Sequence, residues 1–393
     1  MSFFSGLSTV VGLELRQRVR SKRWFIALTA WFVFIGFISG LIIWTARFSY
    51  TQLQTEGYST VLDINAQTGP MVFGTITLFV LGMGLLIAPT FSATSINGDR
   101  AQGTLATLQA TRLSAAQIAS GKLVAAWLTS LTFLVAALPF IIVAVVLGNI
   151  SAWQVIVCFA VVFVEVAVVC AIGLGWSALI SRTAGSVVMT YMCVVGLTII
   201  SLILVACLVP LNMEQGKVRV YGIDTWEYYD DTEPKVTDCT WYESEETFYH
   251  ADRFWWLTAV NPFVIVSDSA PLPDAARDNL TGYVSSTGDP LATIHLAVRA
   301  MAEPMATERD DCYWVLQYYE SYHDAEGNLV LLDQNGRRMD YESPVKVMPV
   351  GAGPPVWPWG MASNVLLGAA FFAVACRRLK VPYRTLPKGI RVA

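Results

Sequence analysis

Six long apolar runs constrain the structure of this chain more than any other feature. They cover residues 24–45, 71–91, 123–147, 153–180, 186–209 and 357–376. A helix of about 20 apolar residues crosses the roughly 30 Å hydrocarbon core of a bilayer. Backbone polar groups in lipid must find partners within the protein, which favours helices as the spanning elements. The sequence therefore predicts an all-α polytopic membrane protein with six transmembrane helices.

The acidic residues are gathered in one part of the chain. Only 14% of the 393 residues are charged, whereas soluble domains average about 25%. Residues 211–353 nevertheless hold 25 of the 30 acids and 10 of the 26 bases. This polar stretch separates the fifth and sixth apolar runs. We predict that it forms an inserted α+β extracytoplasmic domain at 210–354.

The basic residues predict the orientation in the membrane, because short cytoplasmic loops are enriched in Lys and Arg. Bases cluster before the first run, between the second and third, between the fourth and fifth, and after the sixth. Two apolar runs separate each basic segment from the next, so all four segments lie on the same side of the membrane. Only Arg47 lies on the opposite side. The chain is therefore predicted to be a multi-pass protein of the cytoplasmic membrane with both termini in the cytoplasm.

Within the acidic insertion, three segments indicate regular structure. Residues 312–341 alternate apolar runs with turn signals, as in a small antiparallel meander. Residues 289–301 favour a short amphipathic helix. Residues 253–266 are apolar but too short to span, so they form either a helix at the outer interface or one dipping into the membrane. Cys239 and Cys312 are the only cysteines outside the runs, and we expect them to form a disulfide there.

The resulting organisation has five parts. The N-terminal part repeats apolar residues at helical spacing (Phe4, Leu7, Val11 and Leu15), followed by bases. It is either an amphipathic helix on the inner leaflet or only a positively charged anchor. The predicted parts are a cytoplasmic helix at 1–23, transmembrane helices one to five at 24–209, the extracytoplasmic domain at 210–354, helix six at 355–376 and a basic cytoplasmic tail at 377–393.

A polar segment at 97–122 joins the second and third apolar runs. Asn97 and Gly98 predict a turn, and Asp99 is expected to cap a short helix that exposes Leu105 and Leu108 on one face. A break follows at residues 111–113. Ser114 and Gln117 then have capping-box spacing, which predicts a second helix entering the membrane. A short helix with exposed leucines gains little stability alone, so this segment points to a partner protein.

The same segment, DRAQGTLATLQATRLSAAQIASGKL, resembles the signature of type-two ATP-binding-cassette exporter permeases. The matching residues include Asp99, Arg100, Gly103, Thr104, Leu105, Leu108, Thr111, Ser114, Ile118, Gly121 and Lys122. The N-terminal basic helix is similar to the connecting helix of that family. The stretch WWLTAVNPFVIVSDSAP and the basic C-terminal tail resemble the corresponding segments of actinobacterial members in particular.

The resemblance implies a permease that exports an amphiphilic, peptide or drug-like molecule. In the family, this segment is a coupling helix that docks on an ATPase; the docking residues would be Asp99, Arg100, Gly103, Thr104, Leu105, Leu108, Thr111 and Arg112. Gly121-Lys122 lacks the glycine and hydroxyl residue of a phosphate-binding loop. We therefore expect no catalytic residue and no cofactor in this chain. ATP and Mg would bind to two separate ATPase subunits, beside a second permease subunit that is either another copy or a related chain. No nucleic-acid partner is expected.

Glu165 is the only acid within an apolar run. A charged group at that depth costs on the order of 3 kcal/mol on insertion scales and often has a functional role. It either lies on the translocation path or is hydrogen-bonded to a neighbouring helix. The three histidines, His250, His295 and His323, lack the spacing of zinc ligands, so no metal site is predicted.

Two other classes of protein remain as alternatives. A receptor or scaffold would use the outer domain to bind a ligand, but its cytoplasmic segments are too short to signal alone. An integral-membrane enzyme would need clustered acids or histidines near an interface, and Glu165 stands apart from other such residues in the sequence.

Overall fold

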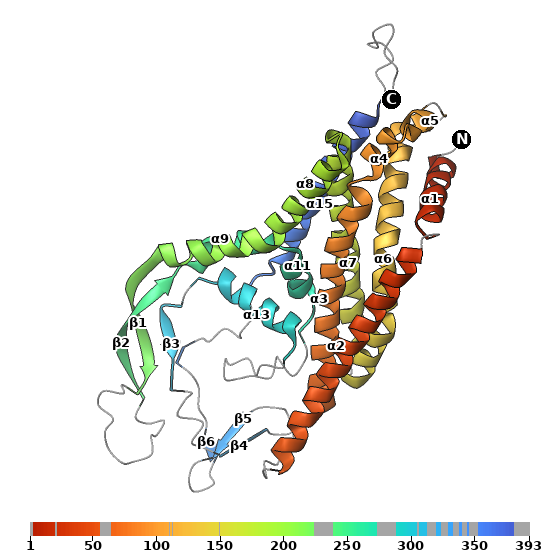
Figure 1. The fold of residues 1–393 in the computed structure, drawn as a ribbon. Coiled ribbons are helices and arrows are strands. Elements are labelled where there is room, and N and C mark those ends of the chain that lie inside the picture. The colour runs from red at the N-terminus through yellow and green to blue at the C-terminus, as the bar shows by residue number, and fades with distance from the viewer. Residues whose placement is uncertain are drawn as a thin grey trace.

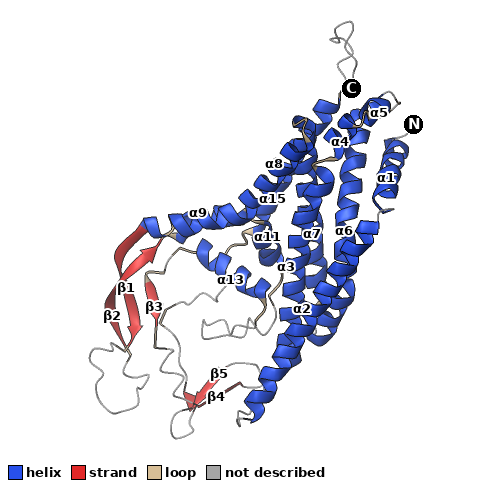
Figure 2. Ribbon diagram, viewed as in Figure 1, coloured by secondary structure: helices blue, strands red, loops and turns tan. Residues whose placement is uncertain are grey.

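The computed structural model consists of a helical bundle with an inserted region of strands and short helices (Figures 1 and 2). It describes residues 3–19, 22–55, 64–109, 111, 113–148, 150–223, 239–272, 288–304, 306–312, 320–323, 329–332, 338–339, 344–345 and 353–380. Arg112, the predicted docking residue in the break after 109, lies outside these ranges. So does most of the basic tail.

Six helices in the described part are long and apolar enough to cross a membrane, which confirms the predicted fold class. They extend the apolar runs at most ends because flanking polar residues continue the helical turns. Their bounds are α2 Lys22–Thr55, α3 Ile64–Ser92, α6 Ala115–Gly148, α7 Ala152–Leu179, a fifth span built from α8 Thr183–Val195, η1 Gly196–Ile200 and α9 Ser201–Leu208, and α15 Trp357–Leu379. The five residues of η1 form a π-helix, which the sequence did not reveal.

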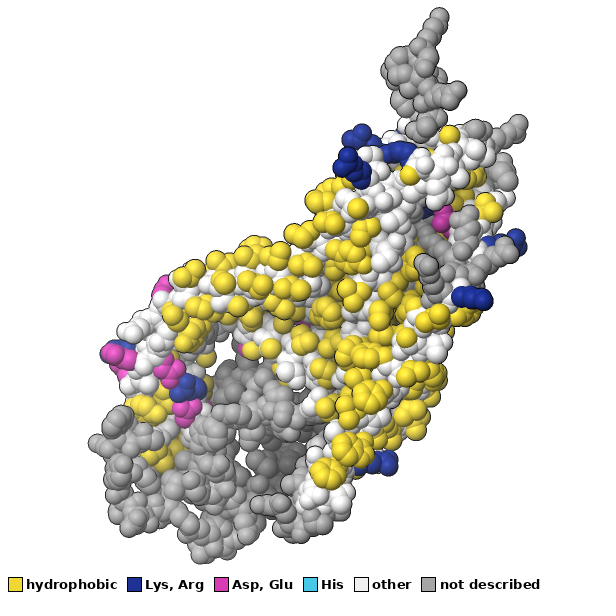
Figure 3. Space-filling view, in the orientation of Figure 1, with side chains coloured by type: hydrophobic (Ala, Val, Ile, Leu, Met, Phe, Trp, Pro, Cys, Tyr) yellow, Lys and Arg dark blue, Asp and Glu magenta, His cyan; other side chains and the backbone are white. Residues whose placement is uncertain are grey.

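Close packing and polar contacts hold the spans together. Gly69 of α3 and Gly148 of α6 face each other so closely that a Cβ on either would collide with the other backbone. The indole nitrogen of Trp31 on α2 donates to the carbonyl of Phe133 on α6 at 2.9 Å. Small residues and interhelical hydrogen bonds are the usual means of association in lipid, where the hydrophobic effect contributes little between helices. Apolar side chains cover the outer flanks of the bundle (Figure 3).

A mixed three-stranded sheet lies between α9 and α15 in the chain. Its strands are β1 Met213–Gly222, β2 Thr240–Tyr249 and β3 Glu308–Asp310, in the order β2-β1-β3. β1 and β2 are antiparallel, with Met213 opposite Tyr249, whereas β1 and β3 are parallel, with Arg219 opposite Glu308. This sheet was not predicted from the sequence.

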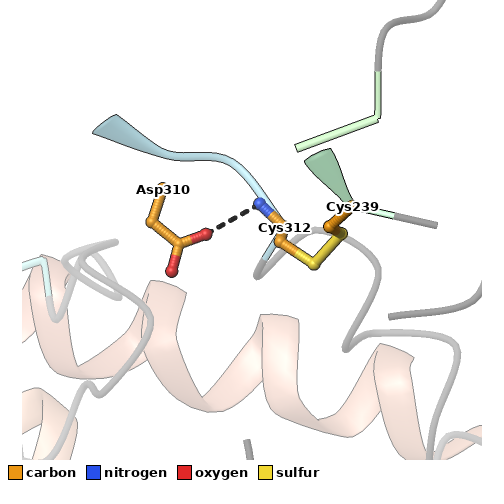
Figure 4. Close-up of a disulfide and its surroundings, with 3 residues drawn as sticks. All are labelled: Cys239, Asp310 and Cys312. Atoms are coloured by element: carbon orange, nitrogen blue, oxygen red, sulfur yellow. Dashed lines mark hydrogen bonds between the residues drawn. A yellow bond between two sulfur atoms is a disulfide. The ribbon is translucent and has the colours of Figure 1, made fainter. Parts of the chain in front are cut away.

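The predicted disulfide between Cys239 and Cys312 is present and closes the end of the sheet (Figure 4). The backbone amide of Cys312 donates to Asp310 at 2.9 Å and to the carbonyl of Tyr221 at 3.0 Å. The bond thus joins the start of β2 to the end of β3 across β1.

Removing this disulfide is expected to lower the stability of the inserted region between α9 and α15. In the chain-entropy model, a cross-link across 73 residues contributes about 4 kcal/mol. Cys239→Ser with Cys312→Ser should therefore unfold this region at lower temperature, as limited proteolysis of the purified protein would show. In denatured, unreduced protein, maleimide should label five of the seven cysteines, because five are free. Labelling of all seven without reductant would contradict the disulfide.

The strands of the predicted meander are present, which confirms that part of the prediction. β4 Glu320–His323, β5 Leu329–Leu332 and β6 Arg338–Met339 form an antiparallel sheet in the order β4-β5-β6. The turn residues between them lie outside the described ranges. The amphipathic helix predicted at 289–301 is also confirmed, as α13 Pro290–Ala302, with the Asp289 carboxylate capping it through the Leu291 amide at 3.0 Å.

The apolar stretch 253–266 is not one helix, as either alternative assumed. It contains α10 Trp255–Ala259 and α11 Pro262–Ser269, which follow a short 3-10 turn and are separated at Val260 and Asn261. Pro262 begins α11, because a proline cannot donate the backbone hydrogen bond that would continue α10. Ile265 and Val266 are fully buried in the main core of the bundle.

Candidate functional site

The segment between α3 and α6 is folded as two short helices at the end of the bundle where both chain ends lie (Figure 1). α4 covers Ser95–Ala101 and α5 covers Thr104–Gln109. The two helices meet at Gly103, whose φ of +73° is a left-handed conformation that favours glycine. Our predicted helix starting at Asp99 is therefore wrong, because α4 begins at Ser95 and the helical conformation is interrupted at Gly103. The predicted turn at Asn97 and Gly98 is also wrong, because both residues lie inside α4.

The two leucines of this segment are not exposed for a partner protein, contrary to our expectation. Leu105 is only 4% exposed and packs in a cluster within the chain, and Leu108 packs against the same cluster. Its buried members are Ile96, Leu105, Ile118, Ala119, Leu174, Ala178, Ala375 and Leu379. Sequence periodicity located the apolar face correctly, but it could not show that α6, α7 and α15 already cover it.

Burial of the leucines leaves a polar surface facing outward. Its exposed residues are Ala101, Gln102, Gly103, Thr104, Thr107 and Thr111. A Cβ added to Gly103 would meet open space. Of the predicted docking residues, Gly103, Thr104 and Thr111 lie on this surface, which we name the α4–α5 surface. Arg100 is half-buried at its edge.

Asn97 fixes α4 to the junction between the fourth and fifth spans. Its side chain is fully buried, and its amide nitrogen donates to the hydroxyl of Ser186 at 2.6 Å and the carbonyl of Ile180 at 3.2 Å. The hydroxyl of Ser177 accepts from the backbone amides of Ile96 and Asn97 at 3.0 and 3.2 Å. The sequence assigned Asn97 only to a turn, so this anchor was missed.

A buried lysine fixes α4 on its other side. Asp99 does not cap a helix; its carboxylate pairs at 2.5 Å with Lys122, whose side chain is completely buried on α6. Lys122 also donates at 2.6 Å to Glu14 of α1, the helix Phe3–Val19. The predicted capping box that begins α6 is confirmed, because Gln117 and Ser114 exchange backbone-to-side-chain hydrogen bonds at 3.2 and 2.8 Å.

The N-terminal helix packs on α6 through a face that adjoins the predicted apolar stripe, whose Leu7, Val11 and Leu15 are half-buried. Gly6 and Val10 of α1 are buried, and Val10 lies against Gly121. Phe4, which belongs to the predicted stripe, is 77% exposed. The helix itself was expected, whereas its close approach to α6 depends on two glycines that carry no periodic signal.

Glu165 on α7 is fully buried, and one of its oxygens accepts a hydrogen bond from Asn364 of α15 at 3.1 Å. Asn364 also donates to the carbonyl of Val260, between α10 and α11, at 3.1 Å. The hydrogen bond to a neighbouring helix, one of our two alternatives for Glu165, is therefore present. The other carboxylate oxygen is buried and has no hydrogen-bond partner among the described residues.

Asp268 joins three elements at the opposite end of α15, and sequence reasoning did not single it out. Its buried carboxylate accepts from Arg299 of α13 at 2.7 Å and from the backbone amides of Val356 and Trp357 at 2.7 and 2.8 Å. Burial and the positive charge of Arg299 lower the pKa of the neighbouring His295, which favours its neutral form. An acid inside the apolar stretch FVIVSDS was the signal available in the sequence.

These features define a class of protein: a multi-pass membrane protein with an anchored polar element at one end of its bundle. The sequence profile of the ABC-2 family transporter protein matches residues 8–264, more than half of the chain. The chain belongs to this family and is the permease component of an ABC transporter. Permeases of the family pair with ABC ATPases and are not themselves catalytic. No match was found among curated protein sequences. Among the described residues, no three His, Cys, Asp or Glu side chains are grouped to hold a metal ion.

Proposed function

We propose that the α4–α5 surface is where this permease docks on its ATPase. The observation that carries this proposal is the combination of outward exposure and firm attachment: Thr104 and Thr107 face outward, while Leu105 and Asn97 bind the element to the spans. A rigid, anchored element can pass a force to the helices that hold it, whereas a free loop would absorb it. Gln109 adds an attachment by donating to the carbonyl of Leu379 at the end of α15 at 3.2 Å.

The distribution of bases supports a cytoplasmic position for this end of the bundle and for both termini. Arg377 and Arg378 lie in the last turn of α15, and Arg182 precedes α8. Lys and Arg side chains gather at this end in Figure 3. Short loops rich in bases face the cytoplasm in membrane proteins, which agrees with an ATPase partner that uses cytoplasmic ATP.

In the proposed assembly, two permease subunits form one pathway above two ATPase subunits, which bind ATP and Mg. The second permease is either another copy or a related chain. Export of an amphiphilic, peptide or drug-like molecule, and the actinobacterial character of the sequence, rest on the resemblance described above. Large apolar side chains of α2, such as Phe25, Phe37 and Trp44, are more than half exposed and are available to lipid or to the second subunit.

Co-purification tests this proposal. The chain, extracted from its native membrane in mild detergent, should bring a polypeptide with a phosphate-binding loop and vanadate-sensitive ATP hydrolysis. A Thr104→Arg,Thr107→Arg variant, which changes only exposed positions, should lose this partner while keeping its own thermal stability. Retention of the ATPase by this variant would place the docking site elsewhere. Absence of any nucleotide-hydrolysing partner would contradict the proposed function.

Glu165 remains a proposed residue of the translocation path, and its hydrogen bond to Asn364 allows a prediction. Glu165→Gln keeps an oxygen that accepts from Asn364, so ATPase co-purification and thermal stability should be unchanged. Glu165→Ala leaves a cavity and removes one of the two acceptors of the Asn364 amide, which should cost about 2–4 kcal/mol and lower the melting temperature. If Glu165→Gln binds a cationic amphiphile as tightly as the unchanged protein, the carboxylate has no direct role in binding that probe.

A further inference from the structure

The completely buried side chain of Lys122 joins three separate elements. Its ammonium group lies 2.6 Å from Glu14 of α1 and 2.5 Å from Asp99 of α4, while the lysine itself belongs to α6. The two carboxylates are partly accessible, with 18% and 25% of their side chains exposed. One positive charge thus holds two negative charges that arrive from different parts of the chain.

A buried ammonium group is costly unless it is paired. Nonpolar residues of similar volume often stabilise a fold as well as a buried ion pair does. Stability alone therefore does not explain why a lysine occupies this position. A charged junction does differ from an apolar one in geometry, because hydrogen bonds fix the directions and distances of their partners.

The surroundings of Lys122 differ on its two sides. α1 packs directly on α6, where Val10 meets Gly121 and the amide of Gln117 donates to the carbonyl of Phe3 at 3.2 Å. Between α1 and α4 there is instead a polar notch of about 180 Å³, and Glu14 and Asp99 both line it. Lys122 bridges α1 and α4 beside this notch.

We propose that Lys122 is a positioning residue that makes α1, α4 and α6 move as one unit when the ATPase acts on the α4–α5 surface. Asn97 ties the other side of α4 to the fourth and fifth spans. The docking element would then drive two groups of helices, one through Asn97 and one through Lys122. That the ATPase drives this movement rests on the proposed function. The contacts of Lys122 with α1 and α4 are a property of the permease alone.

Distances between spin labels test the junction. Thr9 of α1 and Thr107 of α5 are both exposed, so cysteines placed there, in a background whose five free cysteines are replaced by alanine, carry the labels. In the otherwise unchanged permease, measured without the ATPase because Thr107 lies on the α4–α5 surface, the distance distribution should be narrow. Lys122→Met should broaden it, and Lys122→Arg should restore most of the narrow distribution. Lys122→Asp combined with Asp99→Lys again provides one cation for two carboxylates, and should also restore it.

The controls separate this inference from the docking proposal. Glu14→Gln breaks the ion pair between α1 and Lys122 and leaves that between Lys122 and Asp99, so it should broaden the distribution even if Lys122→Met fails to fold. Arg16→Met removes an exposed charge from the same helix and should change nothing. In the ATPase complex, Lys122→Met should reduce nucleotide-driven outward opening about tenfold, a typical size for coupling between sites. Equal, narrow distributions in the unchanged, Lys122→Met and Glu14→Gln permeases, all measured without the ATPase, would overturn the inference.

Discussion

Replacing Leu105 with aspartate is expected to detach α5 from the bundle and abolish ATPase binding. Leu105 is 4% exposed among side chains of α4, α6, α7 and α15. Removing a buried leucine typically costs 2–5 kcal/mol, and an unpaired buried carboxylate adds to that cost. The loss of stability should be about 4 kcal/mol or more. Thermal unfolding in detergent and co-purification of the ATPase measure the two effects.

Thr107→Asp is the matched control, because it adds the same charge two residues along the helix at an exposed position. It should leave the melting temperature unchanged and affect only the interaction with the ATPase. Leu105→Ala should fall between the two, since it creates a cavity without burying a charge. Equal stability of Leu105→Asp and the unchanged protein would show that α5 does not pack as described.

Replacing Asp268 with alanine is expected to be the most damaging change outside the α4–α5 segment. The substitution removes the carboxylate that pairs with the Arg299 guanidinium and that accepts from two backbone amides at the start of α15. Breaking one partner of a buried ion pair costs about 3–5 kcal/mol. The melting temperature should fall, and protease should cut near the start of α15.

Two variants refine this expectation. Asp268→Asn keeps an oxygen for the backbone amides, so it should be destabilised less than Asp268→Ala. Glu243→Ala breaks an exposed ion pair with Lys217 in the same inserted region and should have no measurable effect. If Asp268→Ala and Glu243→Ala behave alike, the start of α15 is not held by Asp268.

Hydrophobic length made the six spans predictable, since membrane helices are set by a simple physical requirement. The capping box at Ser114 and the strands after residue 319 were also readable, because each depends on neighbours in the sequence. The pairing of Cys239 with Cys312 was predicted from their expected extracytoplasmic location and not from geometry. These features share a local or compositional origin.

The mixed sheet could not be predicted in the same way. β1 pairs in parallel with β3, joining Arg219 to Glu308 across a long intervening segment. Parallel pairing of distant segments leaves no turn signal between neighbours. The π-helix at Gly196–Ile200 was equally hidden; there the carbonyl of Thr198 accepts from Asn261, a residue outside the fifth span, at 2.8 Å.

The structure contains short helices between the second and third spans, as the sequence predicted, but their bounds and contacts differ from the prediction. Their position between the second and third spans, the polarity of Thr104 and the role of Ser114 followed from pattern. Burial of Leu105, the anchor at Asn97 and the ion pairs of Lys122 depend on helices that meet only in the folded bundle. In our proposal, the docking surface is therefore formed by the polar residues around Gly103 and not by the leucines.

Photo-cross-linking from position 107 tests the central claim most directly. A benzophenone amino acid replaces Thr107, which is exposed on α5, and intact cells are irradiated before the membranes are extracted. The account predicts a covalent adduct with a cytoplasmic polypeptide that binds ATP. Adducts formed only with this chain, lipid or an extracytoplasmic protein would contradict it.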